Sequence, residues 1–265
     1  MEIIVCIKPV LDPDLPPAKF TVDGKKNEVI PPEGVPFVMS PYDALAVEAA
    51  LRIKEAQGGK ITVLTQGTKY AEEIMRKALA MGADEGVILS DPAFEDSDGF
   101  GTAHVLAQTV KKIGKFDLIL CGRQAADWDA GVVGSLIAEY LNIPVVIRAK
   151  SIEVLDGVLK IERISTNGSE VFELGLPALV TLSSEMGQVR IPSGWGIISA
   201  AKKQVPKWGA TDIGTDPSQT GAAAAVNRLV KLYVPVYERK CEMVTGKDPA
   251  EAAARLTEKI LAIKP

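Results

Sequence analysis

Short apolar runs alternate with amphipathic stretches over the first 148 residues of the chain. Five runs have the length of a strand and are nearly continuous in Val, Ile and Leu: EIIVCIK, KITVLTQ, EGVILS, DLILCG and PVVIR. Helical spacing of apolar residues occupies residues 41–57, 68–81, 99–113 and 131–141. This alternation is typical of βαβ units, and strands of this composition are buried on both faces of a sheet. The pattern predicts an α/β fold with a parallel sheet.

The hydrophobic pattern changes after Ile147 to short alternating runs separated by turn dipeptides. Asp156-Gly157 and Asn167-Gly168 divide these runs, so the segment predicts an antiparallel meander. PALVTLSS then returns as a buried strand. Earlier in the chain, FTVDGKKNEVI lies inside a Pro-rich insert and predicts a surface hairpin.

From Met186 the chain is rich in glycine and proline, and few apolar residues recur with a regular period. A segment of this kind makes no core of its own, so residues 186–225 are expected to be disordered or to lie on a partner as an arm. DPAEAAARLTEKILAIK near the end has an Asp cap, a proline at the first helical position and helical spacing. The sequence thus predicts a domain at 1–185 and, at 186–265, an arm with a terminal helix.

Charge and apolar content limit the classes of partner. The 265 residues include 30 basic and 34 acidic side chains, with no long basic block. This balance argues against nucleic acid or an anionic membrane as the main partner. No signal peptide is recognised, and no apolar stretch reaches the ~18 residues of a membrane span. We therefore expect a cytoplasmic protein that binds a small molecule or another protein.

The sequence has three cysteines and one histidine, so it offers few candidates for metal ligands or catalytic nucleophiles. Cys6 and Cys121 each end an apolar run, with no CxxC and no suitably spaced histidine, so no metal site or disulfide is expected. His104 is a general base in principle, but a lone helical histidine is more often a packing or surface residue. No catalytic residue is assigned.

The ends of three predicted strands converge on one edge of the sheet. Lys8 follows the first strand, Gln66 and Gly67 precede a helix opened by Thr68, and the loop GRQAADWDAGVVGS, residues 122–135, follows DLILC. Ligands of open α/β sheets bind at this edge. No GxxxxGK[ST] or GxGxxG motif is present, and the loop alone is also compatible with a tight turn whose aspartates cap the helix.

Local chemistry within these loops suits a nucleotide. Gly131 and Gly134 permit a close approach of the backbone, and the hydroxyl of Ser135 lies near a helix start. Ser40 and Pro41 begin a helix beside the end of the first strand, where Tyr42 either packs on a purine or covers core.

Several motifs in series carry a resemblance to a known family. VCIKPV, MSPYDALAVEAALRIKE, ALAMGADEGVIL, LILCGRQAADWDAGVVGSLIAEYL and LPALVTLSSEMGQVRIPS…IISAAKK occur in the order and spacing of electron-transfer flavoprotein beta subunits, over nearly the whole chain. The resemblance implies a nucleotide-binding domain of the adenine nucleotide alpha hydrolase-like type, with a C-terminal arm that embraces an alpha subunit. Mapped by motif, it implies nucleotide contacts from Cys6, Ser40, Pro41, Tyr42, Asp43, Gln66, Asp127, Trp128, Asp129, Ala130, Gly131, Val132, Val133, Gly134 and Ser135.

The resemblance also implies the cofactors. The alpha subunit holds most of the FAD, and the beta subunit buries an AMP or, in an electron-bifurcating branch, a second FAD. Val132 and Val133 stand where the family usually has a glutamine followed by threonine or valine, so one polar contact is lost. Trp128 stands where the bifurcating branch tends to have glycine. Because an indole there obstructs a flavin, we favour AMP.

The arm resembles the loop with which the family recognises its redox partners. Gly194 and Trp195 replace a leucine and a proline that anchor a dehydrogenase in better-known members, and Ile197 and Ile198 follow. We expect Trp195 to stand at the tip of an irregular loop as a docking anchor, although it is also compatible with packing on its own subunits.

The resemblance implies an electron shuttle from flavin dehydrogenases, such as acyl-CoA dehydrogenases, to a quinone reductase or another flavoprotein. Two alternatives remain: a subunit of a bifurcating NADH-linked flavoprotein, and a stand-alone adenine-nucleotide sensor or hydrolase. The long unsupported arm argues against the sensor.

Overall fold

The computed structural model describes residues 1–67, 69–155, 157–236 and 241–263. Thr68, expected to open the second helix, and Asp156, expected in a turn of the meander, lie outside the described residues.

The described residues form a nine-stranded sheet in the order β11-β10-β9-β12-β8-β1-β6-β7-β13. The strands from β9 to β13 in this order are parallel, whereas β9, β10 and β11 pair antiparallel. The bounds are β1 Glu2–Cys6, β6 Lys60–Gln66, β7 Glu85–Leu89, β8 Leu118–Gly122, β9 Val145–Leu155, β10 Val158–Ser165, β11 Gly168–Gly175, β12 Ala178–Leu182 and β13 Lys207–Trp208. The α/β fold, the parallel sheet and the meander are confirmed, and the hydrolase-like classification stays a prediction.

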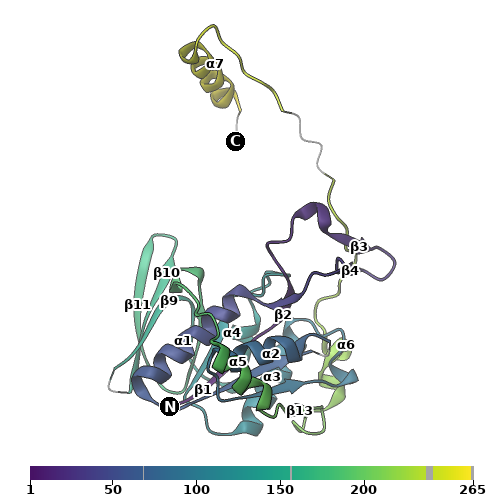
Figure 1. Cartoon of the computed structure of the whole chain (residues 1–265), viewed down its shortest axis with the longest axis vertical. Helices are drawn as coiled ribbons and strands as arrows, with labels where there is room; N and C mark the ends of the chain where they lie inside the picture. Colours follow the sequence, from purple (N-terminus) through teal and green to yellow (C-terminus); the bar gives the residue numbers. More distant parts are fainter. Residues whose placement is uncertain (68, 156, 237–240, 264–265) are drawn as a thin grey trace.

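Helices cover both faces of this sheet, as Figure 1 shows. Those that pack on the body are α1 Pro41–Gln57, α2 Ala71–Met81, α3 Gly99–Ile113, α4 Val133–Leu141, α5 Gly194–Lys202 and α6 Gly221–Ala224, and a further helix is α7 Pro249–Ala262. Short 3-10 turns occupy Pro17–Lys19, Pro92–Phe94, Ser184–Met186 and Pro217–Gln219. The expected ranges 41–57 and 99–113 match α1 and α3, while α2 and α4 begin a few residues later than the apolar spacing suggested.

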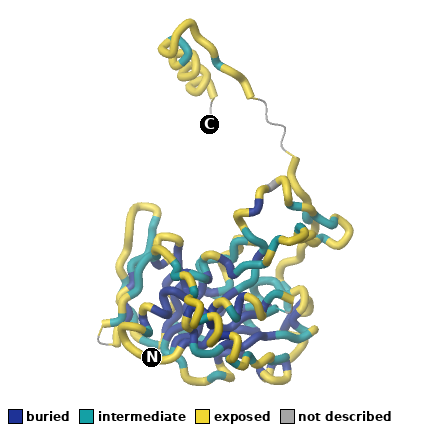
Figure 2. Tube along the Cα trace, viewed as in Figure 1, coloured by how far each residue is buried: buried dark blue, intermediate teal, exposed yellow. Residues whose placement is uncertain are grey.

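Alternate side chains of each strand belong to different halves of the core. Ile3 and Val5 of β1 pack with α1 and α2, whereas Ile4 and Cys6 pack with α3 and α4. Both halves are built from Ile, Leu, Val and Ala, as the nearly continuous apolar strands predict. Figure 2 shows this core as the dark blue centre of the body.

The Pro-rich insert between β1 and α1 contains two small antiparallel pairs. β3, Thr21–Asp23, and β4, Glu28–Ile30, form the expected hairpin. β2, Pro9–Leu11, pairs with β5, Phe37–Met39, and closes the base of the insert. The strand expected to end at Arg148 and the first run of the meander are one continuous strand, β9.

Residues 194–224 pack on the sheet domain, so the expectation that the whole segment 186–225 lacks support is wrong. α5 packs against α2, β13 adds the edge strand beside β7, and α6 lies against α3. Trp208 of β13 is half-buried against the core of the α3 face. A division of the chain at residue 185 stays a prediction, but packed structure continues to Ala224.

Beyond Ala224 the residues up to Val236 leave the body as an extended segment, and α7 follows later in the sequence (Figure 1); that residues 225–265 act as an arm around a partner stays a prediction. The backbone N–H groups of Val226 and Asn227 donate to Asp98 Oδ2 at 2.9 and 2.8 Å. The N–H of Leu232 donates to the side-chain oxygen of Asn27 in the hairpin. α7 contains no buried residue. Among the described residues, no helix combines the length and the apolar character needed to cross a bilayer.

Candidate functional site

The strand order places a topological switch point between β1 and β8. The connection from β1 leads through α1 to β6 on one side, and the connection from β7 leads through α3 to β8 on the other. Loops diverge at such a point and leave a crevice outside the carboxyl ends of the strands, where α/β proteins bind ligands. The crevice is therefore bounded by the residues that follow β1, β6 and β8, and by the start of α1.

Asp43 joins the two strands at the switch point. Its carboxylate is buried and accepts the backbone N–H of Lys8 at 2.8 Å and that of Gly122 at 3.1 Å. Burial raises the pKa of Asp43 to about 7, against the opposing influence of these two N–H groups and of the Lys8 ammonium. Gly122 is required here, because a Cβ at this position would lie 2.4 Å from Asp43 Oδ1. Asp43 thus fixes the walls of the crevice.

Four buried side-chain atoms near this edge have no hydrogen-bond partner among the described residues. They are Ser40 Oγ, Thr65 Oγ1, Gln66 Oε1 and Arg123 Nε. Thr65 and Gln66 end β6, Arg123 follows β8, and the N–H of Ser40 is bonded to the carbonyl oxygen of Lys8 at the end of β1. An unpaired buried polar group costs about 1 to 3 kcal/mol, so unpaired atoms beside the ends of three neighbouring strands favour a polar ligand at this edge of the sheet.

Among these four atoms, the hydroxyl of Ser40 most clearly lacks a partner. Ser40 precedes α1 in the position where a serine usually caps a helix, but its side chain makes no capping bond, and the residue is fully buried. The Gln66 amide nitrogen lies 3.3 Å from the Phe94 carbonyl and 3.4 Å from Ser97 Oγ, which leaves its oxygen for another donor. Both residues belong to the predicted site.

Arg123 is a site residue that the sequence reasoning did not single out. Its guanidinium lies 4.8 Å from the centre of the Tyr42 ring, and its backbone N–H donates to the Leu182 carbonyl. Tyr42 therefore packs on a cation in this structure, and a contact with a purine stays a prediction. The signal in the sequence was a basic residue directly after the glycine that ends a buried strand.

The loop 123–132 closes one side of the crevice through an ion pair that the sequence did not predict. Lys8 Nζ lies 2.6 Å from Asp127 Oδ2, which joins the end of β1 to the loop after β8. Asp129 has a φ of 50° and accepts the Gln124 side-chain amide at 2.7 Å. The two aspartates thus shape the loop, and neither caps α4.

The amino terminus of α4 is open. Its N-cap position is Val132, which provides no side-chain bond to the first N–H groups of the helix. Gly131 has a φ of +65°, a conformation that suits glycine and delays the helix start to Val133. Uncapped N–H groups from Val133 to Ser135 suit an anion, as expected for a phosphate site.

Gly134 has a packing role that the sequence did not suggest, and its predicted role in ligand approach stays a prediction. A Cβ at this position would lie 2.7 Å from Thr181 Cγ2 of β12, so the absent side chain permits close packing of α4 on the sheet. Trp128 is 57% exposed and does not belong to the core. The steric argument from Trp128 against a second flavin stays a prediction, as do the contacts assigned to Pro41, Ala130 and Val133.

The thiol of Cys6 is not part of the crevice surface. Cys6 and Cys121 are register partners on β1 and β8, and both are buried in the core of the α3 face. A hydrogen bond with Cys6 and burial raise the pKa of the Cys121 thiol. A nucleotide contact of Cys6 would therefore involve its backbone.

His104 is a packing residue in this structure. Its Nε2 lies 2.9 Å from Thr215 Oγ1, and Tyr140 lies edge-on at 5.5 Å. Burial holds the pKa of His104 below its ordinary value.

The predicted partner-recognition residues lie on a helix, so the expectation of an irregular loop at Trp195 is wrong. Ser193 caps α5 by accepting the Gly196 N–H at 3.0 Å, and the helix continues to Lys202. Trp195 in its first turn is 83% exposed, and Ile197 and Ile198 are also exposed. The expected exposure of Trp195 is confirmed.

Comparison with known proteins gives a consistent result over nearly the full length. Residues 29–213 match the family described as the electron transfer flavoprotein domain. The chain is 40% identical over 261 residues to the caffeyl-CoA reductase-Etf complex subunit CarD of Acetobacterium woodii, with 98% of each chain covered. It is 38% identical, with the same coverage, to an electron transfer flavoprotein subunit beta of Thermoanaerobacterium thermosaccharolyticum. It is 36% identical to the protein FixA of Bradyrhizobium diazoefficiens, over 95% of this chain and 89% of the relative.

Proposed function

The chain belongs to the electron-transfer flavoprotein beta subunit family, and from that premise we propose that it works as one half of a heterodimeric electron shuttle. The heterodimer accepts electrons from flavin dehydrogenases, such as acyl-CoA dehydrogenases. It delivers them to a quinone reductase or another flavoprotein acceptor. This chain provides the scaffold, a nucleotide site and a docking surface, and an alpha subunit is its partner.

The group of unpaired buried polar atoms at the switch point carries the nucleotide part of the proposal. Ser40, Gln66 and Arg123 have unpaired side-chain atoms beside the ends of β1, β6 and β8, where these donors and acceptors are available to an adenine nucleotide. The open start of α4 supplies positive potential suited to a phosphate. The residues present therefore fit AMP.

FAD, when bound in the heterodimer, supplies the redox chemistry by accepting and releasing electrons. The residues of this chain hold the crevice in shape instead. Asp43 fixes the ends of β1 and β8, and the ion pair of Lys8 with Asp127 holds the loop after β8. No acid, base or nucleophile is assigned.

Exposed apolar side chains on the arm support the partner part of the proposal. Val230 and Val236 of the arm and Leu261 of α7 are highly exposed and belong to a longer series of exposed large apolar side chains in residues 226–263, and such a series favours a covering chain. A stand-alone nucleotide sensor would leave this surface in water. We assign the arm and α7 to the alpha subunit, and Trp195 with Ile198 to the redox partner.

A second candidate is a subunit of a bifurcating complex with a second FAD in place of AMP. The relative at 40% identity that is named as a subunit of a caffeyl-CoA reductase-Etf complex is compatible with this candidate. The crevice chemistry suits the adenosine part of either nucleotide.

The nucleotide content of the purified heterodimer tests the proposal. The chain is co-expressed with its alpha subunit, the complex is denatured, and released nucleotides are separated and quantified by chromatography. Equal amounts of FAD and AMP support the shuttle, whereas FAD at twice the heterodimer concentration with no AMP supports the second candidate. FAD alone, equimolar with the heterodimer, would contradict a nucleotide site in this chain.

A further inference from the structure

Helix α5 is attached to the body with very little apolar burial. Ala200 is its only buried residue. Gly196, one turn earlier on the same face, lies so close to α2 that a Cβ would be 2.3 Å from the Ala80 carbonyl oxygen. The opposite face carries Trp195 and Ile198, both exposed. Apolar packing therefore contributes little to the position of α5.

Polar contacts hold the carboxyl end of α5. Arg76 of α2 donates through Nη1 to the carbonyl oxygens of Ala200, at 2.8 Å, and Lys203, at 2.6 Å. The ammonium of Lys203 donates in turn to the Ala83 carbonyl at 2.6 Å. These contacts fix the end of the helix, and the orientation of its exposed first turn depends on the segment before it.

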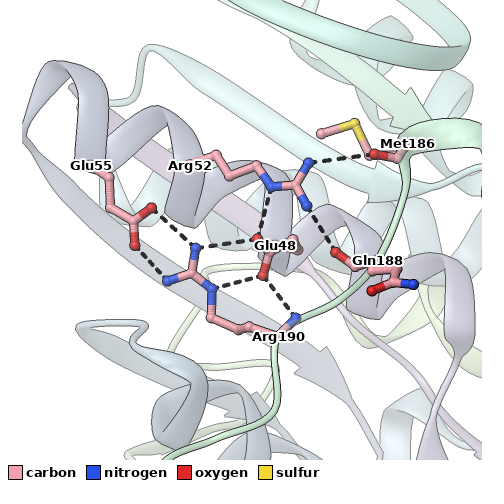
Figure 3. Close-up of polar contacts among 6 residues, drawn as sticks. All are labelled: Glu48, Arg52, Glu55, Met186, Gln188 and Arg190. Atoms are coloured by element: carbon pink, nitrogen blue, oxygen red, sulfur yellow. Dashed lines mark hydrogen bonds and ion pairs between the residues drawn. The ribbon is translucent and has the colours of Figure 1, made fainter.

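That segment, residues 186–190, is held by a network of two arginines and two glutamates (Figure 3). Arg190 donates through Nε to Glu48 Oε2 at 2.8 Å and through Nη2 to Glu55 Oε2 at 3.1 Å. Its backbone N–H also donates to Glu48 at 3.2 Å. Arg52 donates to the other oxygen of Glu48 at 2.8 Å and to the Gln188 carbonyl at 2.8 Å. Glu48, Arg52 and Glu55 all belong to α1.

The charged groups of this network stabilise one another in their ionised forms. Burial opposes ionisation of Glu48, but bonds from Arg190 and Arg52 outweigh it and hold the pKa of Glu48 below its ordinary value. Bonds to Glu55 and Glu48 raise the pKa of Arg190. Because Glu48 is buried, truncation of Arg190 would remove one of the two cations that compensate its charge. Arg190 and Glu48 therefore form a strong attachment between α1 and the chain entering α5.

We propose that Arg190 is a positioning residue for redox-partner recognition, because it fixes the start of α5 and hence the place where Trp195 and Ile198 face an electron-donating flavoprotein. Arg190 is four residues before Gly194, the first residue of the helix. The side-chain hydrogen bonds that hold this segment all come from α1, whose first turn contains Asp43 at the crevice. This inference rests on the proposed docking role of α5.

Electron transfer to the intact heterodimer from a purified acyl-CoA dehydrogenase tests it. We expect Arg190→Ala to raise the KM for the dehydrogenase roughly tenfold, with kcat changed by less than about twofold, because the docking face is misplaced but still present. Arg190→Lys keeps a cation that reaches one glutamate at a time, so its KM should lie between those of wild type and Arg190→Ala. The matched control is Arg163→Ala, which removes an arginine paired at 2.6 Å with Glu170 on the meander and should leave KM unchanged.

Trp195→Ala separates this inference from the proposed function. If Trp195→Ala raises KM and Arg190→Ala does not, α5 docks the partner without help from Arg190 and the inference is wrong. If neither substitution changes KM, the docking face lies elsewhere and both proposals fail. If Arg190→Ala raises KM no more than Arg163→Ala does, the effect is one of general charge and the inference is also wrong.

A second measurement covers the case in which Arg190→Ala prevents assembly. Glu55→Gln removes only the exposed partner of Arg190 and keeps Glu48 in place. We expect faster backbone hydrogen exchange in residues 187–200 of the Glu55→Gln heterodimer, together with a higher KM. Unchanged exchange in this segment overturns the positioning role.

Discussion

The crevice and the exposed face of α5 leave opposite kinds of group without a partner. At the crevice, Ser40 and Gln66 bury polar atoms that find no hydrogen bond in the described part of the chain. Beside α5, the buried carboxylate of Glu48 on α1 is bonded to Arg52 and Arg190, while Trp195 of α5 and Ile191 before it, the latter 91% exposed, remain in water. Unpaired polar atoms favour a small polar ligand, and uncovered apolar side chains favour a protein surface. The two regions therefore indicate two classes of partner within one fold.

Removal of the arm and α7, residues 225–265, is expected to have the largest effect and would sharpen this comparison most. The arm meets the body through a few hydrogen bonds, such as those of Asp98 and Asn27, so the body should still melt cooperatively. The truncated chain lacks the exposed apolar residues that we assign to the contact with the alpha subunit. We therefore expect no stable heterodimer in size-exclusion chromatography. A truncated chain that still assembles and retains flavin would contradict the assignment of the arm.

Asp43→Asn tests whether burial raises the pKa of the Asp43 carboxyl group at the crevice. The folded pKa of Asp43 is about 7, above the value of ~3.9 in an unfolded chain. The folded state thus holds the proton more tightly, so the stability contributed by this proton is complete below about pH 4 and is lost as pH rises through 7. We expect the unfolding free energy of wild type to fall by about 2 to 4 kcal/mol more than that of Asp43→Asn between pH 4 and 8.

Denaturant titrations of both proteins at several pH values provide the measurement. Groups such as His104 titrate in both proteins, so their contribution cancels in the difference. Parallel pH profiles would mean that Asp43 is ionised throughout and that its two backbone N–H bonds outweigh its burial.

Gly134→Ala tests whether this glycine serves packing or ligand approach. A Cβ would lie 2.7 Å from Thr181 Cγ2, so we expect a loss of about 2 kcal/mol in the unfolding free energy. Thr181→Ser removes that methyl group and keeps the hydroxyl that accepts the Arg148 N–H at 3.0 Å. The double variant should recover most of the loss in thermal or denaturant unfolding. A loss of bound nucleotide at unchanged stability would favour ligand approach instead.

Ser40→Ala has the smallest expected effect. It is neutral or favourable for the stability of the free protein and unfavourable for nucleotide retention. Without nucleotide, removal of a buried unpaired hydroxyl should leave stability unchanged or raise it by about 1 kcal/mol. With nucleotide, we expect roughly fivefold weaker retention, measured as AMP content after dialysis. Thr109→Val is the control, because the Thr109 hydroxyl is buried but already donates to Val105 at 2.8 Å. Equal AMP retention in Ser40→Ala and wild type would remove Ser40 from the site.

Much of the crevice was predictable because its residues follow strands that the sequence marks clearly. Ser40, Asp43, Gln66 and the loop after β8 all lie where βαβ topology brings strand ends together. The contacts of these residues were not predictable. Whether Asp43 faces a ligand or two backbone N–H groups depends on the distance between α1 and β8, which no local pattern encodes.

The sequence by itself determined the elements whose signals are local: the buried strands, the limits of α1 and α3, the hairpin and the meander. Only the tertiary structure decided the fate of the glycine-rich stretch after Met186. It showed that α5 lies on α2, that β13 adds an edge strand, and that Arg190 binds Glu48 across 142 residues of sequence. The physical reason is that this stretch lacks a periodic apolar face of its own, and its contacts, such as those of residues 186–203 with the polar groups of α1 and α2, exist only after those helices have packed on the sheet.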